Sequence, residues 1–221
     1  VRKIFDAVLK VGGGDDVAAS VETIMDGGMG EEQVSKVLAG FGFRETHRAA
    51  RVLKSIVSSS GLTGSSALDA RARDAFRQVA ALMFEGISQS PSPDLALNNL
   101  GALIAAHRFP EQLFGALKEE GFRKLILTVC GTSSKLARGL AKDELLLELL
   151  LSNRAALAQP WNGKRHRSEK LVLLKEREEL RAGIRHVLGI SSFRDYTNEL
   201  SRLADEAIAY VFEEECKTRG L

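Results

Sequence analysis

Residues 125–140 form the stretch whose residue types most suggest a phosphate-binding loop. The run is LILTVCGTSSKLARGL, in which an apolar segment leads to Gly131, Thr132 and Ser133 and then to helical spacing. Read as a strand, a glycine turn and a helix, this pattern would cradle a phosphate on backbone N–H groups. Read as a buried helix, a capped break and a second helix, it holds no ligand. The two interpretations predict different functions.

A second candidate is a row of arginines in the segment KEREELRAGIRHVLG, residues 175–189. Arg177, Arg181 and Arg185 follow one another at four-residue spacing, so on a helix they form a slowly rotating row. An arginine near an apolar surface usually buries its stem and pairs its guanidinium with a carboxylate or a carbonyl. The row is therefore typical of helix–helix ion pairs, or it faces another domain or a phosphate-bearing ligand.

The helical wheel also predicts how deeply these arginines lie. Arg177 projects within about 40° of Leu173 on the apolar side, so we expect it to be buried. Its expected partners are Glu199 and Asp205 on the next helix, because a buried guanidinium needs a carboxylate. Arg185 rotates off the apolar face, and we expect it to be the more exposed residue.

Other residues with catalytic or binding potential are scattered. None of the four histidines forms an HxxxH or HExxH pair, so we expect no metal site; they are His47, His107, His166 and His186. Gly12–Gly14 lacks the Gly-Lys-Ser/Thr of a phosphate loop and reads as a turn. The basic run Lys164–Arg167 has no interleaved aromatic residues, which favours a solvated linker over a phosphate contact.

Composition bounds the classes of protein to consider. The chain has 221 residues, of which 44% are hydrophobic, so it can bury a sizeable core. Its 31 basic and 29 acidic residues leave a net charge of +2. That balance gives no argument for a nucleic-acid or membrane partner, and we expect neither.

The cysteines and the apolar runs indicate the compartment. Only Cys130 and Cys216 are present, which argues against a disulfide framework and fits a reducing cytoplasm. The longest apolar run, Leu145–Leu151, is broken by Glu148 and is too short to span a bilayer. The chain begins at Val1 without a signal-peptide pattern, so we expect a piece of a longer cytoplasmic protein.

The elements that must position these residues are helices almost throughout. One helical face is formed by apolar residues at three- and four-residue spacing, namely Ala72, Phe76, Val79, Met83 and Ile87. A second is formed by Tyr196, Leu200, Leu203, Ala204, Ala207 and Val211. We therefore predict an all-α fold, an irregular bundle of about a dozen mostly short helices that ends in two long ones.

Breaks between helices predict the domain organisation. Ser92, Pro93 and Asp94 read as an N-cap, a first-turn proline and an acidic residue at the helix dipole. We predict N-terminal helices over 1–33, a helical bundle over 34–158, an exposed linker over 159–167 and two long helices over 168–221, joined at Gly189–Ser192.

The segment 175–189 resembles a helix of the bacterial glutamate–ammonia-ligase adenylyltransferases, which reads Lys-Arg-Arg-Glu-x-Leu-Arg-Ile-x-x-Arg-Asp-Leu-Leu-Gly. The matching residues are Lys175, Arg177, Glu178, Leu180, Arg181, Ile184, Arg185, Leu188 and Gly189. Glu176 stands where the family usually has arginine, and His186 where it usually has aspartate.

Three further segments resemble that family in the same order along the chain. Thr197–Asp205 is similar to Thr-x-Glu-Leu-Ser-x-Leu-Ala-Asp, and Ser92–Leu100 to a Ser-Pro-Asp-x-Ala-Leu stretch. Leu38–Phe43, followed by Ala49–Leu53, resembles the Leu-Gly-Phe opening. Together the matches cover roughly residues 34–216, whereas residues 1–33 match nothing in the family.

The resemblance implies a role without chemistry of its own. Family members use two nucleotidyltransferase domains, one to transfer AMP from ATP to a tyrosine of glutamine synthetase and one to remove it. A helical segment precedes each domain, and a region between them responds to the PII signal protein and to glutamine. This chain resembles such a helical lead-in, stopping before the catalytic sheet. The missing initial methionine and the unmatched residues 1–33 favour the lead-in to the second domain.

The missing catalytic motif decides between the two interpretations of residues 125–140. A nucleotidyltransferase holds magnesium and ATP through Asp-x-Asp after a Gly-Ser, and the chain contains no Asp-x-Asp. We therefore expect no cofactor here, Gly131 as a helix stop, and Thr132 or Ser133 as an N-cap. Two alternatives stay open: a stand-alone helical adaptor, and a nucleic-acid-binding domain that uses Lys164–Arg167 and the arginines.

Overall fold

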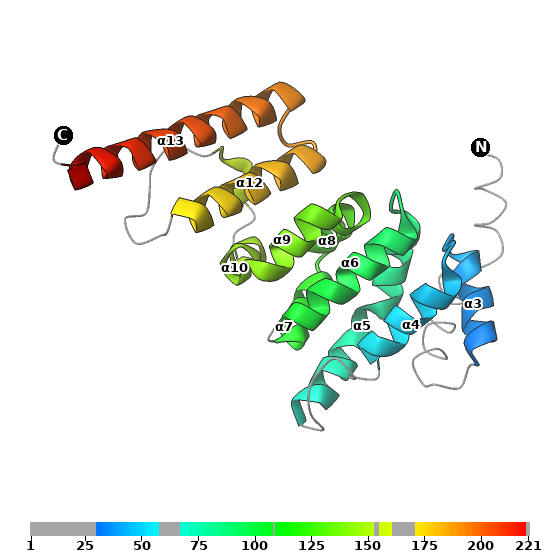
Figure 1. The fold of residues 1–221 in the computed structure, drawn as a ribbon. Helices are drawn as coiled ribbons and strands as arrows, with labels where there is room; N and C mark the ends of the chain where they lie inside the picture. Colours follow the sequence, from blue (N-terminus) through cyan, green and yellow to red (C-terminus); the bar gives the residue numbers. More distant parts are fainter. Residues whose placement is uncertain (1–29, 58–66, 108, 153–154, 161–170, 220–221) are drawn as a thin grey trace. The chain divides into compact units, whose positions relative to one another are not determined.

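The computed structural model describes residues 30–57, 67–107, 109–152, 155–160 and 171–219. These residues form the helices α3 to α13 and no strand, so the predicted all-α fold is confirmed (Figure 1). The helices expected before residue 30 and most of the expected linker over 159–167 lie outside the described residues. Within the described part of the chain, no helix is both long enough and apolar enough to cross a membrane.

The chain divides into two compact units, Val1–Ala141 and Lys142–Leu221. The predicted organisation had instead grouped residues 34–158 as one bundle. The difference arises at α10 and α11, because α10 packs against α11 and α11 packs against α12. These short helices therefore belong with the C-terminal helix pair.

The first unit is built around α6, which packs between α4 and α8. Its helices are α3 Glu31–Gly40, α4 Thr46–Val57, α5 Ala67–Ser88, α6 Pro93–Ala106, α7 Pro110–Leu117, α8 Glu120–Thr132 and α9 Ser134–Lys142. Helix α5 covers α7 and α8, and α3 covers α4. The largest buried side chains are Phe76, Phe84 and Phe114, and the rings of Phe76 and Phe114 lie 5.2 Å apart.

The predicted apolar face of α5 is confirmed. All five of its residues are buried, each at most 2% exposed: Ala72, Phe76, Val79, Met83 and Ile87. Removing these side chains from water is the main favourable contribution that a helix of this kind makes to folding. Periodicity alone was sufficient to predict this buried face, because the whole face points into one continuous core.

Helix α6 begins as the sequence predicts and also caps a neighbour. The Ser92 hydroxyl accepts a hydrogen bond from the Leu95 N–H at 3.4 Å, and Pro93 occupies the first turn. The Asp94 carboxylate accepts hydrogen bonds from the backbone N–H groups of Arg44 and Glu45, both at 2.9 Å. These donors lie at the start of α4, so Asp94 joins the N-termini of two helices.

The stretch 125–140 is helical, which excludes the strand interpretation. Helix α8 continues to Thr132, and the Ser133 hydroxyl then accepts a hydrogen bond from the Leu136 N–H at 3.3 Å, so the predicted capped break is confirmed. Gly131, however, does not stop the helix, because it lies inside the last turn of α8. A Cβ there would lie 3.0 Å from the Ser90 Cβ, so glycine permits close packing of α8.

The second unit consists of α10 Glu144–Ser152, α11 Ala155–Ala158, α12 Leu171–Val187 and α13 Phe193–Arg219. The Asp143 carboxylate accepts a hydrogen bond from the Leu146 N–H at 3.0 Å and so caps α10. The buried residues of this unit include Leu146, Leu150 and Leu157, which bring α10 and α11 into its core. The two long helices at the end of the chain agree with the prediction.

Candidate functional site: the α12–α13 hairpin

A glycine ends α12 and turns the chain toward α13. Gly189 has a φ of +70°, a conformation that side chains with a Cβ rarely adopt. The Ile190 N–H donates to the Arg185 carbonyl at 2.9 Å, and the Gly189 N–H donates to the His186 carbonyl at 3.0 Å. This pair of bonds is a Schellman motif, which satisfies the last carbonyls of α12. The turn was predicted from the Gly189–Ser192 break.

A capping box starts α13 immediately afterwards. The Asp195 N–H donates to the Ser192 hydroxyl at 3.1 Å, and the Ser192 backbone N–H donates back to the Asp195 carboxylate at 3.2 Å. The Ser192 hydroxyl also donates to that carboxylate at 2.6 Å. These hydrogen bonds to the charged form lower the pKa of Asp195 below its usual value.

An ion pair joins the two long helices beside this turn. The Arg185 guanidinium donates to the Glu199 carboxylate at 2.5 Å, and the two side chains are only 6% and 8% exposed. The expectation that Arg185 would be the exposed member of the row is therefore wrong. It points into the hairpin because α13 folds back over that face of α12, which a single-helix wheel cannot represent.

Arg177 is less buried than expected and has a different partner. Its Nε donates to the Asp143 carboxylate at 2.7 Å, with the two side chains 23% and 17% exposed. The partner in this ion pair is therefore Asp143 and not the expected Glu199 or Asp205, and Asp205 is exposed. Asp143 precedes α10 and is 34 residues away in sequence, so helical spacing could not point to it.

The rotation of α12 explains these differences. Leu180 and Ile184 are buried at 8% and 0% exposure, but Leu173, which marked the apolar side in the sequence, is 53% exposed. Leu174 is buried in its place at 5% exposure. Since one residue corresponds to about 100° of rotation, this shift moves Arg177 outward and Arg185 inward.

Arg181 completes the row with a backbone partner. Its Nη2 donates to the Gln159 carbonyl at 2.6 Å, and its Nε lies 3.3 Å from the Glu178 carboxylate. The three arginines of α12 therefore bind the start of α10, the residue after α11, and α13. Each has a partner within this unit, which agrees with the structural interpretation of the row.

An aromatic stack closes the same end of the hairpin. The His186 ring lies parallel to the Tyr196 ring with centroids 5.0 Å apart, and edge-on to the Phe193 ring at 6.0 Å. The sequence patterns predicted no partner for His186. Its role depends on α13 folding back onto α12, which places residues ten positions apart in contact.

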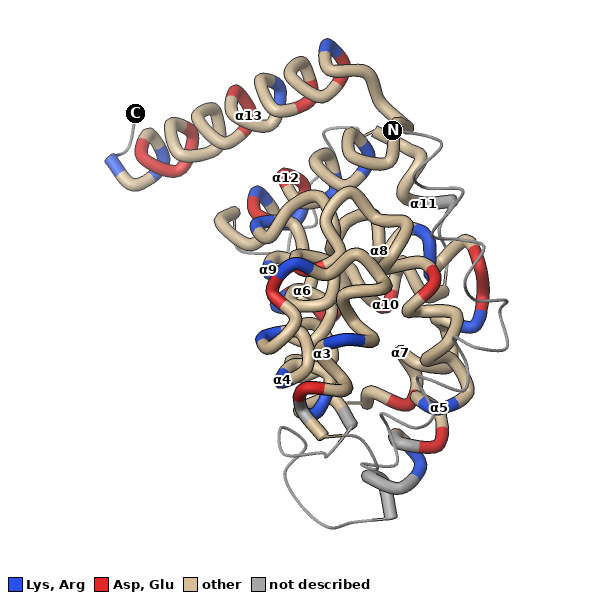
Figure 2. The backbone as a smooth tube through the Cα atoms, turned by 90° about the vertical axis from the view of Figure 1, so that its right-hand side faces the viewer, with Lys and Arg blue, Asp and Glu red and all other residues tan. Residues whose placement is uncertain are grey.

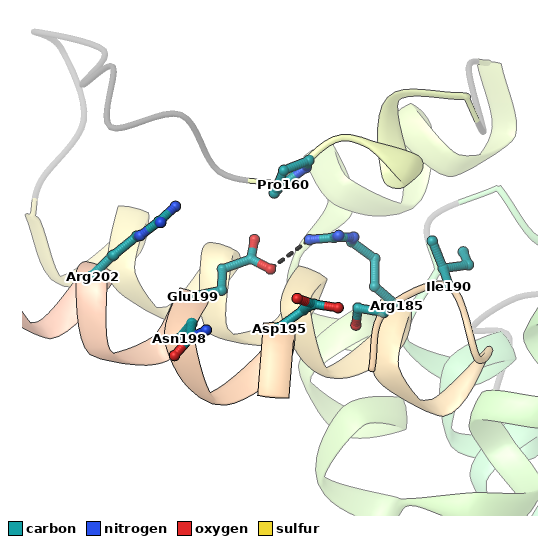
Figure 3. A pocket seen from close by; sticks show the side chains of 8 residues that line it. Pro160, Arg185, Ile190, Asp195, Asn198, Glu199 and Arg202 are labelled. Carbon is teal, nitrogen blue, oxygen red and sulfur yellow. Dashed lines mark hydrogen bonds and ion pairs between the residues drawn. The ribbon is translucent and has the colours of Figure 1, made fainter. Parts of the chain in front are cut away.

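A small polar recess lies beside the ion pair (Figure 3). It is lined by Pro160, Arg185, Ile190, Ser191, Asp195, Asn198, Glu199 and Arg202. Its volume of about 210 Å³ is below the roughly 300–1,000 Å³ of most ligand sites. The Arg185 Nε and the Ser191 hydroxyl are buried there without a hydrogen-bond partner among the described residues.

The two cysteines differ in exposure. Cys130 is 1% exposed, and burial raises the pKa of its thiol to about 12. Cys216 lies partly exposed on α13. Over the described ranges, no three His, Cys, Asp or Glu side chains gather closely enough to hold a metal ion.

Helix α13 carries an apolar row that its own unit leaves uncovered. Leu203 is buried at 5% exposure, whereas Ile208, Val211 and Phe212 are 68%, 53% and 69% exposed. The predicted face from Tyr196 to Val211 is therefore buried only around Leu203. The exposed row of three residues, which we term the α13 apolar row, spans more than one turn of the helix.

Comparison with known proteins adds no identity to this description. No protein-family model matches the chain, and no curated protein or solved structure matches it either. The class that the fold defines is therefore an all-α protein whose second unit ends in a helical hairpin.

Proposed function

We propose that the chain is a non-catalytic helical scaffold segment of a glutamate–ammonia-ligase adenylyltransferase. In this proposal the parent enzyme transfers AMP from ATP to a tyrosine of glutamine synthetase, removes it again, and responds to the PII signal protein. The chain supplies the helical platform on which an adjoining nucleotidyltransferase domain of the same polypeptide rests. Magnesium and ATP would be bound by carboxylates of that domain.

The observation that carries the proposal is where the family-like residues lie. Arg185 and Glu199 form the buried ion pair, and Gly189 forms the turn between them. Leu203, in the second family-like segment, is buried. Arg185, Gly189 and Glu199, all residues of the resemblance, thus fix α13 relative to α12, as expected for a motif whose role is to orient a helix.

The α13 apolar row supports a docking role for that helix. Burying one such side chain completely is worth about 1.5–3 kcal/mol, and more than half of each surface is still exposed. The three together would contribute on the order of 3–5 kcal/mol to holding a second domain. A domain in the same polypeptide needs no more, because the covalent link gives it a high effective concentration.

The first test is the reading frame that encodes the chain. The proposal expects a Gly-Ser followed by an Asp-x-Asp in the same polypeptide, downstream of α13. A complete reading frame that lacks this motif would contradict the proposal. It would favour the second candidate, a helical adaptor that uses the α13 apolar row to bind a separate protein.

The second test compares the chain with the intact polypeptide. Phe212→Ser and Val211→Ser should leave the melting of this chain unchanged, because both side chains are exposed in it. In the intact enzyme the same pair should lower AMP transfer to glutamine synthetase and destabilise the catalytic domain. Leu145→Ser, an exposed apolar site on α10 at 61%, is the matched control. Equal effects of both changes would rule out the proposed docking surface.

A further inference from the structure

Among the helices of the first unit, α4 and α9 each carry three exposed basic residues and no acidic residue, and α4 has two arginines where α9 has one. Helix α4, Thr46–Val57, contains Arg48, Arg51 and Lys54 and no acidic residue. All three side chains are exposed, and Arg44 is exposed just before the helix. Figure 2 shows the basic positions along α4 in blue.

The opposite face of α4 fixes the direction of these cations. Ala49, Ala50 and Leu53 are 4%, 0% and 0% exposed, and α4 packs against α3 and α6 through that side. The Asp94 carboxylate holds the N-terminal end of the helix through its two backbone hydrogen bonds. The helix therefore cannot rotate to bury its basic residues, and they stay in solvent.

The arginines of this face form few and exposed ion pairs. Arg48 lies 3.2 Å from Glu45, but both side chains are 58% exposed, so this pair contributes little. Within the described part of the chain, neither Arg44 nor Arg51 forms an ion pair through its guanidinium. Guanidinium groups of this kind bind carboxylates in a bidentate manner.

We infer that the α4 basic face, comprising Arg44, Arg48 and Arg51, is a docking surface for an acidic helix of a partner protein. Arginines at three- and four-residue spacing match carboxylates that repeat with the same period on a facing helix. The basic strip is one helix wide. The packed neighbour α3 exposes Glu32 as well as Lys36, and Asp94 and Glu45 lie at the start of α4.

This narrow strip favours a protein helix over a nucleic-acid duplex. A duplex presents phosphates on two strands, and proteins that bind it usually contact many of them with basic residues from several elements. The net charge of +2 adds little long-range attraction for a polyanion. The inference is independent of the proposed function, because it concerns α4 and requires no catalytic domain.

The test measures binding of labelled probes to the full chain by fluorescence anisotropy at low salt. The main probe is a helix-forming alanine peptide with glutamate at every third or fourth position. The same peptide with lysine in place of glutamate, and a labelled DNA duplex, are the comparison probes. We expect the glutamate peptide to bind more tightly than either.

Two charge-reversed variants locate the binding. Arg44→Glu, Arg48→Glu and Arg51→Glu together should weaken glutamate-peptide binding by about tenfold or more. The matched control reverses the exposed Lys135, Arg138 and Lys142 of α9, with the same change in net charge, and should retain binding. Circular dichroism checks that both variants are folded.

Three results would overturn the inference. Equal weakening by the two variants would mean that binding reflects overall charge and not α4. Tighter binding of the duplex through the same arginines would mean that the surface recognises phosphate. No measurable binding of the glutamate peptide would mean that spaced carboxylates are not its ligand.

Discussion

Helices α4 and α12 both carry arginines at three- or four-residue spacing, yet the structure uses them differently. On α12, Arg177, Arg181 and Arg185 bind Asp143, the Gln159 carbonyl and Glu199 within one unit. On α4, Arg48 and Arg51 face solvent. The same pattern is thus internal structure in one helix and a free surface in the other. The segments that cover α12 lie on the side that carries its arginines, whereas α3 and α6 pack against the opposite face of α4.

The largest effect is expected at the buried ion pair. Arg185→Ala leaves the Glu199 carboxylate buried without its guanidinium, which should cost about 3–5 kcal/mol of stability. Urea unfolding, combined with hydrogen exchange of α13 amides, measures this loss. The double variant Arg185→Met, Glu199→Leu should recover most of it, since no charge then remains buried. A loss below about 1 kcal/mol would place Arg185 in the same category as the α4 arginines.

A smaller loss is expected at Arg177. Its ion pair with Asp143 is partly exposed, so Arg177→Ala should cost about 1–2 kcal/mol. Asp143→Asn is the informative comparison, because it weakens the ion pair but keeps the polar group that caps α10. An effect of Arg177→Ala larger than that of Arg185→Ala would reverse the order of burial described above.

The turn between the helices should be moderately sensitive. Gly189→Ala places a Cβ on a residue with a φ of +70°, which should cost about 1–2 kcal/mol. Nothing lies within 4 Å of that Cβ, so the cost comes from the backbone and not from a clash. Thermal melting measures it, with Gly115→Ala as the control, because that helical glycine also has open space. A stabilised Gly189→Ala variant would contradict the assigned turn.

The capping box predicts a pH effect. The pKa of Asp195 is lower in the folded chain than in the unfolded chain, because Ser192 donates hydrogen bonds to its carboxylate. Its contribution is therefore present above the unfolded pKa and is lost as pH falls through the folded pKa. Asp195→Asn should flatten the acid side of the stability profile of α13. An unchanged profile would show that the cap makes no measurable contribution.

The smallest effect is expected on α4. Arg51→Ala removes an exposed cation and should change stability by less than about 0.5 kcal/mol. Urea unfolding of the variant provides the measurement. A loss comparable to that of Arg177→Ala would mean that Arg51 is held by the fold and that α4 offers no free basic surface.

Local patterns predicted the parts of the fold that depend on neighbours in sequence. The break at Ser133, the N-cap at Ser92 and the turn at Gly189 each involve hydrogen bonds between residues within a few positions of one another. The buried face of α5 followed from its spacing, because a single core covers the whole face. The prediction for Gly131 was wrong, because glycine is needed there to leave room for Ser90, which lies on another segment.

The sequence by itself determined that this protein is helical, where many of its helices begin and end, and that its chain contains no Asp-x-Asp pair. Only the tertiary structure decided which arginine of α12 is buried, that Asp143 is the partner of Arg177, and that Ile208, Val211 and Phe212 stay exposed. The physical reason is that helix formation depends on residues within a few positions of one another. Burial depends on which distant segment covers each face, and helical spacing carries no information about that segment.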